Sequence, residues 1–362
     1  MNSKTTVGIL CGGKSAEHEI SLLSAKNIIE AIDKEKYEVK VIGIDKSGQW
    51  YLCDSGEPFI NANDPKTIEL SKREAVTLPA GLGGQLWSLM TGKVVATIDV
   101  VFPILHGPCG EDGTVQGLLK LAEVAFVGAS VLGSAVGMDK DVMKRLLKDA
   151  AIPVANFQTL KQGEPIDFSA LSLKFGLPLF IKPANMGSSV GVSKVRNEAD
   201  FTEALKSAFC YDSKIIVEEY IKGREVECAV LGNENPVASE LGEIVPTHDF
   251  YSYEAKYLDE NGAKLQIPAK VPEEIKHKIQ QMAIQVFKVL ECEGLGRVDF
   301  FLKENGEILV IEINTMPGFT KISMFPTLWG ISGLKYSDLI DRLIKLALAR
   351  FEREGKLKSS VG

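Results

Sequence analysis

Apolar and polar residues follow two regular patterns along the chain, and its first part shows both. The chain opens with a short apolar run that ends in a glycine turn, TTVGILCGG at 5–13, which predicts a buried strand. Apolar residues then recur at helical spacing over 15–33, and a second strand follows at 37–45. This order predicts a parallel, doubly wound α/β domain. We expect it to continue through the strand IDVVFPIL at 98–105 to about residue 130.

The later pattern predicts two further domains. A glycine- and serine-containing stretch precedes a helix with the sequence DVMKRLLKDA, and we place a boundary there. The next part mixes helices with the strands LPLFIKP and KIIVEEY and reads as a small α+β domain. The last part carries the strands ECAVLG, GRVDFFLK and EILVIEIN and a closing helix. The fold class is therefore α/β and α+β multidomain, with domains at 1–130, 131–225 and 226–362.

The most informative pattern is a hairpin in the last domain. Two alternating strands flank a turn that contains Asn305-Gly306, a strong hairpin signal. Side chains two residues apart in a strand share a face. On this basis the first strand has one face with Arg297, Asp299 and Phe301. The second strand has one face with Val310, Glu312 and Asn314, and an opposite face with Ile311 and Ile313.

If the polar faces of this hairpin coincide, Asp299, Glu312 and Asn314 converge as oxygen ligands beside the guanidinium of Arg297. Hard oxygen donors suit Mg²⁺, which shares its coordination shell with water and substrate phosphates. The alternative is a solvated hairpin face whose acids are incidental.

Two segments of the central domain suggest a nucleotide site. A strand delivers Lys182 and is followed by a glycine and serine loop, in which Ser188, Ser189 and backbone amides can surround phosphate oxygens. The loop lacks the spacing of a P-loop, and an ordinary flexible connection is the alternative. The strand KIIVEEY ends on two carboxylates and an aromatic residue, and its edge could offer backbone amide and carbonyl groups to a purine, with Glu225 available to ribose hydroxyls. A solvated strand end is the alternative.

Two smaller clusters lie in the first domain. Glu17 follows a glycine turn at the start of a helix, which can form an anion or ammonium site. His106 has no Cys or His partner at metal-ligand spacing, so a polar loop histidine is the alternative to a functional one. No Ser-His-Asp order and no GxSxG motif occur, which disfavours a hydrolase.

Composition narrows the class of partner. The 362 residues are 45% hydrophobic and 25% charged, as in a soluble globular protein, and no apolar run reaches the roughly 18 to 20 residues that span a bilayer. The N-terminus lacks a signal peptide pattern, so we expect a cytoplasmic protein without a membrane partner. A net charge of −7 disfavours nucleic acid, and six scattered cysteines without a CxxC pair indicate neither disulfides nor a thiolate metal site.

Taken in chain order, these segments resemble the ATP-grasp superfamily, and within it the bacterial D-alanine–D-alanine ligases. The resemblance spans almost the whole chain and is carried by GGKSAEHEIS (12–21), LHGPCGEDGTVQG (105–117), MDK (138–140), FIKPANMGSSVGV (180–192), EEYIKGREVE (218–227), YSYEAKY (251–257), GRVDFFL (296–302) and IEINTMPGFT (311–320). It implies an ATP-grasp fold and the ATP-dependent ligation of two D-alanines through an acyl phosphate.

The resemblance also implies the role of each site residue. The residues that match ATP-binding positions are Lys140, Lys182, Ser188, Ser189, Glu218, Glu219, Tyr220, Ile221, Glu225 and Lys256. Those that match ligands of two Mg²⁺ ions, which Mn²⁺ can replace, are Asp299, Glu312 and Asn314. Those that match D-alanine-binding or catalytic positions are Glu17, His106, Ser188, Tyr257, Arg297, Gly318, Ser323 and Met324.

Within the resemblance, Glu17 and His106 place the first ammonium group, and Ser188 and Tyr257 form a hydrogen-bonded pair that links the loop and a lid to Glu17. Arg297 and the Gly318 amide face the tetrahedral oxyanion. The tyrosine in YEAKY favours D-alanine over D-lactate as second substrate. Met324 replaces a leucine common in relatives, a change of similar volume that should be tolerated.

Three other interpretations compete. A related carboxylate–amine ligase lacks the YEAKY and NTMPG context found here. A nucleotide-binding regulatory protein with the same fold predicts the loss of a metal ligand or of Arg297, and none is lost. A plain doubly wound binding domain leaves the acid-bearing hairpin unexplained. Members of the family are commonly homodimers, so we expect a homodimer.

Overall fold

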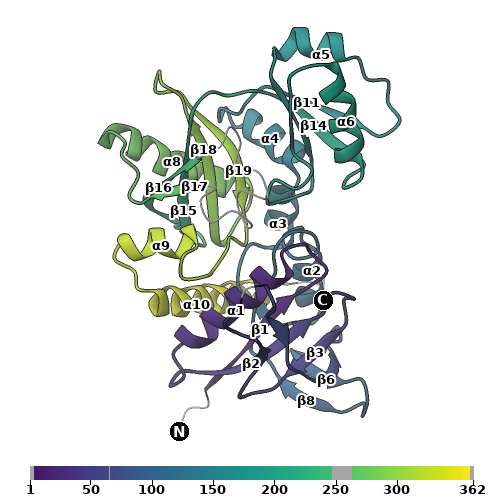
Figure 1. Ribbon diagram of the computed structural model, residues 1–362. Helices are drawn as coiled ribbons and strands as arrows, with labels where there is room; N and C mark the ends of the chain where they lie inside the picture. The colour runs from purple at the N-terminus through teal and green to yellow at the C-terminus, as the bar shows by residue number, and fades with distance from the viewer. Residues whose placement is uncertain (1–3, 65, 247–262, 359–362) are drawn as a thin grey trace.

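The computed structural model describes residues 4–64, 66–246 and 263–358. In Figure 1 the N-terminal sheet lies at the bottom, the C-terminal sheet at the upper left and a small central sheet at the upper right. None of the helices in the described ranges is long and apolar enough to cross a membrane.

The N-terminal sheet has eight described strands in the order β10-β9-β1-β2-β3-β6-β7-β8. Their bounds are β1 (Thr5–Gly12), β2 (Tyr37–Ile44), β3 (Trp50–Cys53), β6 (Lys72–Thr77), β7 (Gln85–Ser88), β8 (Val94–Thr97), β9 (Val100–Ile104) and β10 (Ala125–Phe126). A separate two-stranded pair is formed by β4 (Phe59–Ile60) and β5 (Glu69–Leu70).

The predicted parallel arrangement holds for only half of this sheet. The strands β10, β9, β1 and β2 are parallel, whereas β3, β6, β7 and β8 extend the sheet in antiparallel pairs. The antiparallel strands are short and closely spaced along the chain, which leaves no room for the crossover helices that parallel strands require.

Helices cover both faces of the N-terminal sheet, as the doubly wound prediction requires. One face packs against α1 (His18–Ala31) and α10 (Tyr336–Gly355), and the other packs against α2 (Thr114–Leu121). The helix α10 comes from the far end of the chain, and its Leu343 shares a core with Val7 of β1. Arg350 of α10 is buried and donates hydrogen bonds of 2.7 Å to the carbonyl of Phe126 and 2.5 Å to that of Gly128.

The central unit is an antiparallel sheet with its own core. Its order is β11 (Phe157–Lys161), β14 (Lys214–Glu219), β12 (Leu179–Pro183) and β13 (Ser193–Val195), and it is covered by α5 (Phe168–Phe175) and α6 (Glu198–Phe209). In β12, Leu179 and Ile181 point into this core, and the alternate residues Phe180 and Lys182 line a cavity.

The C-terminal unit is an antiparallel sheet in the order β17 (Ala263–Gln266), β16 (Val237–Pro246), β15 (Arg224–Gly232), β18 (Gly294–Leu302) and β19 (Ile308–Asn314). Further helices of the described chain are α3 (Val131–Met138), α4 (Lys140–Asp149), α8 (Glu273–Val289) and α9 (Met324–Ile331). Met143 and Leu147 of α4 share the core formed by α8 and this sheet. The domain limits of the sequence analysis stay predictions.

The hairpin of β18 and β19 corrects one detail of the predicted faces. Asp299 lies opposite Glu312, but Phe300 lies opposite Val310, so Ile311 is an extra residue at a β-bulge. Val310 therefore joins the buried core with Phe300 instead of sharing the face of Glu312. The alternation rule failed here because a bulge shifts the strand period by one residue.

Candidate active site

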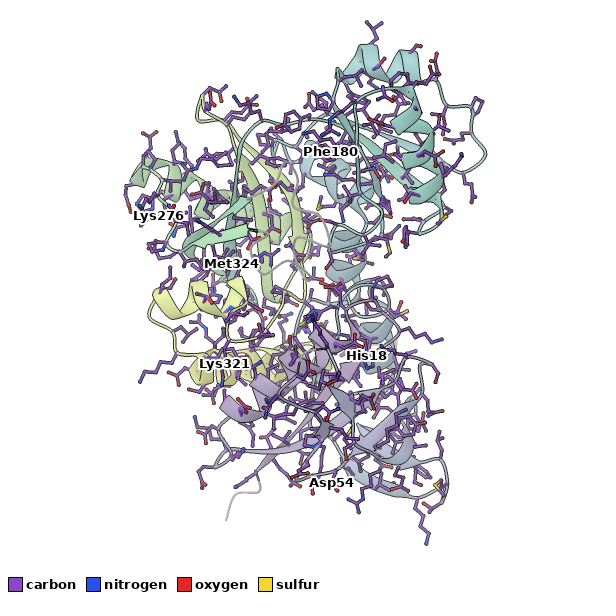
Figure 2. The ribbon with its side chains drawn as sticks, in the orientation of Figure 1. His18, Asp54, Phe180, Lys276, Lys321 and Met324 are labelled. Carbon is purple, nitrogen blue, oxygen red and sulfur yellow. The ribbon has the colours of Figure 1, made fainter. Side chains whose placement is uncertain are left out.

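Two cavities adjoin the C-terminal sheet and meet at its polar face. The first is lined by β12, the loop at 184–192, the end of β14 and the β18–β19 hairpin. The second is lined by the start of α1, the loop with His106 and the segment 316–324. Five residues line both cavities: Gly187, Glu227, Ile244, Arg297 and Glu312. Figure 2 labels residues near the site from all three units, among them His18 beside Glu17, Phe180 in β12 and Met324 in α9.

The first cavity gathers most of the residues predicted to bind a nucleotide. These are Lys140, Lys182, Ser189, Glu218, Glu219, Tyr220, Ile221 and Glu225. Segments far apart in the sequence therefore share one wall, because β12 and β14 are neighbours in the central sheet. Phe180 and Tyr220 add two rings to it, with centroids 6.2 Å apart.

A buried carboxylate at the wall of this cavity holds two lysines. Glu218 lies 2.5 Å from the Nζ atoms of both Lys182 and Lys144. Burial raises the pKa of Glu218, but the two lysines lower it by more, to about 2. The sequence analysis did not assign Lys144. Its position one helical turn after Lys140 could have indicated that the two lysines lie on the same face of the helix. Its partner Glu218, however, comes from a distant strand.

The loop between β12 and β13 connects the two cavities. Ser188 and Ser189 both have positive φ angles, 52° and 61°, which is unusual for residues other than glycine and costs on the order of 1 kcal/mol or more each. Ser189 lines the first cavity and Ser188 the second. The Ser188 hydroxyl donates a 2.6 Å hydrogen bond to Glu17 at the start of α1. The loop thus joins the central unit to the N-terminal unit.

The hairpin brings its polar residues together as predicted. Asp299 lies opposite Glu312 and Arg297 opposite Asn314. Arg297 binds Asp299 through two 2.7 Å hydrogen bonds, and the Asn314 amide donates to the same carboxylate at 2.9 Å. Lys140 lies 3.1 Å from Glu312. Burial lowers the pKa of Arg297, but Asp299 and Glu227 raise it by more, so the guanidinium keeps its charge.

The donor set of this hairpin fits a hard divalent cation. It offers two carboxylates and an amide on one polar face. In the described ranges no group of three acidic, histidine or cysteine side chains is close enough to bind a metal ion by itself. Mg²⁺ is commonly bound by one or two carboxylates and completes its shell with water and substrate phosphates. In this structure Arg297 and Lys140 neutralise the same two carboxylates.

The second cavity contains the residues predicted to bind the amino acid substrates: Glu17, His106, Ser188, Arg297, Gly318, Ser323 and Met324. His106 is buried with Nδ1 3.1 Å from the Met316 carbonyl oxygen, and burial lowers its pKa despite the nearby carboxylate of Glu17. The Ser323 hydroxyl accepts a 3.0 Å hydrogen bond from the Thr320 amide, which shapes the segment after Gly318.

Met324 is the first residue of α9 and is buried against Gly242 of β16. A Cβ atom at Gly242 would lie only 2.4 Å from the Met324 sulfur. The absence of a side chain at Gly242 therefore makes room for methionine at this wall of the second cavity.

Two further acids at the site were missed from sequence. Glu111 accepts hydrogen bonds from the amides of Gly107 and Met316, and burial together with Glu17 raises its pKa to about 8. Glu227 lines both cavities and pairs with Arg297. Both acids lie inside segments that carry the resemblance, but their burial becomes visible only in the fold. Lys256 and Tyr257 lie outside the described residues.

Comparison with known proteins identifies the family of the chain. Two family models match the chain, D-ala D-ala ligase N-terminus at residues 6–129 and D-ala D-ala ligase C-terminus at 146–345. A D-alanine–D-alanine ligase of Shouchella clausii is 55% identical, and the alignment covers 99% of both chains.

Solved structures give the same result. The D-alanine-D-alanine ligase of Coxiella burnetii is 39% identical with a TM-score of 0.84, covering 98% of this chain and 96% of that one. A D-Ala:D-Ser ligase of Enterococcus faecalis is 35% identical with a TM-score of 0.84, covering 95% of this chain and 100% of that one. The chain belongs to the D-alanine–D-alanine ligase family.

Proposed function

We propose that this protein joins two molecules of D-alanine to D-alanyl-D-alanine, with ATP converted to ADP and phosphate, as a step in peptidoglycan precursor synthesis. The observation that carries the proposal is the junction of the two cavities. A nucleotide in the first cavity would direct its phosphates toward Arg297 and Glu312, and these residues also line the second cavity. A phosphoryl group could thus be transferred from one cavity to a carboxylate in the other.

In the first step, Lys140 and Lys182 hold the ATP phosphates, and the wall formed by residues 218–221 with Glu225 holds adenine and ribose. Glu17 and His106 orient the ammonium group of the first D-alanine. Its carboxylate attacks the γ-phosphate, ADP leaves and an acyl phosphate forms. Asp299, Glu312 and Asn314 would hold two Mg²⁺ ions, or Mn²⁺, which would neutralise charge that develops on the transferred phosphoryl group.

In the second step, the amine of the second D-alanine attacks the acyl carbon, and phosphate leaves. Arg297 and the Gly318 amide donate hydrogen bonds to the tetrahedral oxyanion, and one such donor contributes on the order of 3 kcal/mol. Ser323 and Met324 form the wall that binds the second substrate. Water must be excluded because it would hydrolyse the acyl phosphate, and we assign this to the Ser188 loop.

The experiment that tests the proposal measures phosphate release from ATP and Mg²⁺ with four substrate sets: D-alanine, D-serine, D-alanine with D-lactate, and L-alanine. Product masses are determined in parallel. We expect a D-alanyl-D-alanine mass and no phosphate release with L-alanine. Because a D-Ala:D-Ser ligase has a similar fold, a mixed D-alanyl-D-serine product would revise the second substrate. No turnover with any set would contradict the ligase assignment.

We propose further that the protein is a cytoplasmic homodimer. The support is a set of exposed apolar side chains on α2, α3 and the end of α10, namely Leu118, Leu121, Leu132 and Phe351. Lys120 and Glu354, 3.1 Å apart, hold α2 beside α10 in this surface. Light scattering after size-exclusion chromatography should give twice the chain mass, and Leu121→Glu should give the monomer mass. A monomeric wild type would contradict the proposal.

A further inference from the structure

Glu227 occupies an unusual position between the two cavities. It lies on β15, directly opposite Asp299 of β18, and is only 4% exposed. Its Oε2 atom is 3.1 Å from Nε of Arg297, and both side chains line both cavities. None of the roles assigned above involves Glu227.

Arg297 therefore has two carboxylate partners that differ in their other contacts. Asp299 binds the guanidinium at two nitrogen atoms and also accepts a hydrogen bond from Asn314. Glu227, on the neighbouring strand, contacts the Nε atom as an ion pair at 3.1 Å without a hydrogen bond. In the proposed function Asp299 is a metal ligand, so a metal ion and Arg297 compete for one carboxylate.

This competition explains why a second carboxylate, that of Glu227, lies beside Arg297. A buried guanidinium that loses its carboxylate partner is strongly destabilised or turns toward other groups. A buried carboxylate is itself costly, so its presence on the wall of a cavity requires a cationic partner that remains there. The flanking residues Val226 and Cys228 point into the hydrophobic core on the other face of the strand.

We propose that Glu227 is a positioning residue, which keeps Arg297 aimed at the junction of the two cavities when Asp299 binds the metal. The inference rests on the proposed function. Glu227 lines both cavities, and we assign its effect to its contact with Arg297. Its removal should leave Arg297 bound to Asp299 alone, which weakens metal binding and misplaces the guanidinium in the second chemical step.

The main test compares Glu227→Gln with a matched control, Glu243→Gln. Glu243 lies on the adjacent strand β16, is also buried, and pairs with Arg224 through hydrogen bonds of 2.7 and 2.6 Å, but it lines neither of the two cavities. Each substitution removes one buried carboxylate charge, and both residues belong to the C-terminal sheet. We expect kcat to fall on the order of 10- to 100-fold in Glu227→Gln and to change less than about twofold in the control.

A second readout separates positioning from a merely structural effect. ATP labelled with ¹⁸O in its β,γ-bridge scrambles the label into the β-phosphate when acyl phosphate forms and reverts. At saturating Mg²⁺, where weaker metal binding no longer limits the first step, Glu227→Gln should slow mainly the second step, so the ratio of scrambling to dipeptide formation should rise about tenfold or more. Equal losses in scrambling and dipeptide formation, or wild-type kcat, would overturn the proposal.

A third readout does not depend on turnover. Calorimetry with Mg²⁺ and ADP should show a dissociation constant for Mg²⁺ raised about tenfold in Glu227→Gln and unchanged in the control. In an Arg297→Lys background the effect of Glu227→Gln should largely disappear, since the two residues act as a unit. An undiminished effect there would contradict action through Arg297. A wild type without ligase activity would refute the proposed function, and the calorimetry would still decide the pairing.

Discussion

The hydroxyl of Ser188 donates a 2.6 Å hydrogen bond to the carboxylate of Glu17, and the two residues lie 171 positions apart in the chain. One belongs to the loop of the central unit and the other begins the first helix of the N-terminal unit. Because both line the second cavity, this single contact joins the two units at the place where we propose that the first D-alanine binds.

Loss of this contact should impair catalysis more than folding. A hydrogen bond to a charged group contributes about 1.5–3 kcal/mol, so Ser188→Ala should lower kcat/KM for D-alanine roughly 10- to 100-fold. Steady-state phosphate release measures the effect. Ser172→Ala is the control, since its hydroxyl also donates a hydrogen bond, to the Ser169 carbonyl, but lies on α5 outside both cavities. Equal kinetics for the two variants would refute the role of the contact.

Glu312→Gln should nearly abolish turnover while the fold stays intact. The substitution removes one of two carboxylates proposed to bind Mg²⁺ and the partner of Lys140. We expect phosphate release to fall by about 100-fold or more at saturating Mg²⁺, with an unchanged circular dichroism spectrum. Glu307→Gln, at the exposed turn of the same hairpin, should behave like wild type. Wild-type turnover in Glu312→Gln would remove this residue from the metal site.

Glu218 should make the free energy of unfolding depend on pH below about 4.5. Its folded pKa of about 2 lies below the ordinary value of 4.5, so its stabilising contribution is present above pH 4.5 and is lost as the pH falls toward 2. The shift corresponds to about 3 kcal/mol. Urea unfolding from pH 6 to 3.5 should therefore show a shallower acid loss in Glu218→Gln, which is less stable at pH 6. Glu203→Gln, a largely exposed surface acid, should keep the wild-type slope.

Arg350 should be important for stability and not for chemistry. Its buried guanidinium donates hydrogen bonds to the carbonyls of Phe126 and Gly128 and lies 4.4 Å from the centre of the Phe126 ring. Arg350→Met keeps much of the volume but leaves two buried carbonyls without these donors, so unfolding free energy should fall by about 2–4 kcal/mol. Chemical denaturation measures this loss. A change below about 0.5 kcal/mol would show that water replaces the donors.

Local patterns predicted most of the fold that surrounds the site. The turn at Asn305-Gly306 and the alternation of polar residues were enough to predict that Asp299, Glu312 and Asn314 lie together. The bulge at Ile311 was not predictable, because residues 308–311 are all apolar and a shift of one residue among them does not change the visible pattern. The antiparallel half of the first sheet was also missed, since its strands are very short.

Contacts between distant segments are the second feature that the sequence pattern could not predict. Lys144 with Glu218 and Glu227 with Arg297 join residues whose proximity follows from sheet order and helix packing, which the sequence pattern alone does not give. The burial that shifts the pKa of Glu111 has the same origin. The roles of the site residues stay predictions that the experiments above address.

The position of α10 on the N-terminal sheet has a consequence for synthesis of the chain. The hydroxyl of Tyr37 in β2 binds Asp341 of α10, 304 residues later. Until the ribosome has delivered that helix, the face of the first sheet with Val7, Ile9 and Phe102 lacks the part of its apolar cover that α10 provides beside α1. Nascent chains should therefore expose hydrophobic surface for tens of seconds at ordinary translation rates. This makes them substrates for chaperones that bind hydrophobic segments.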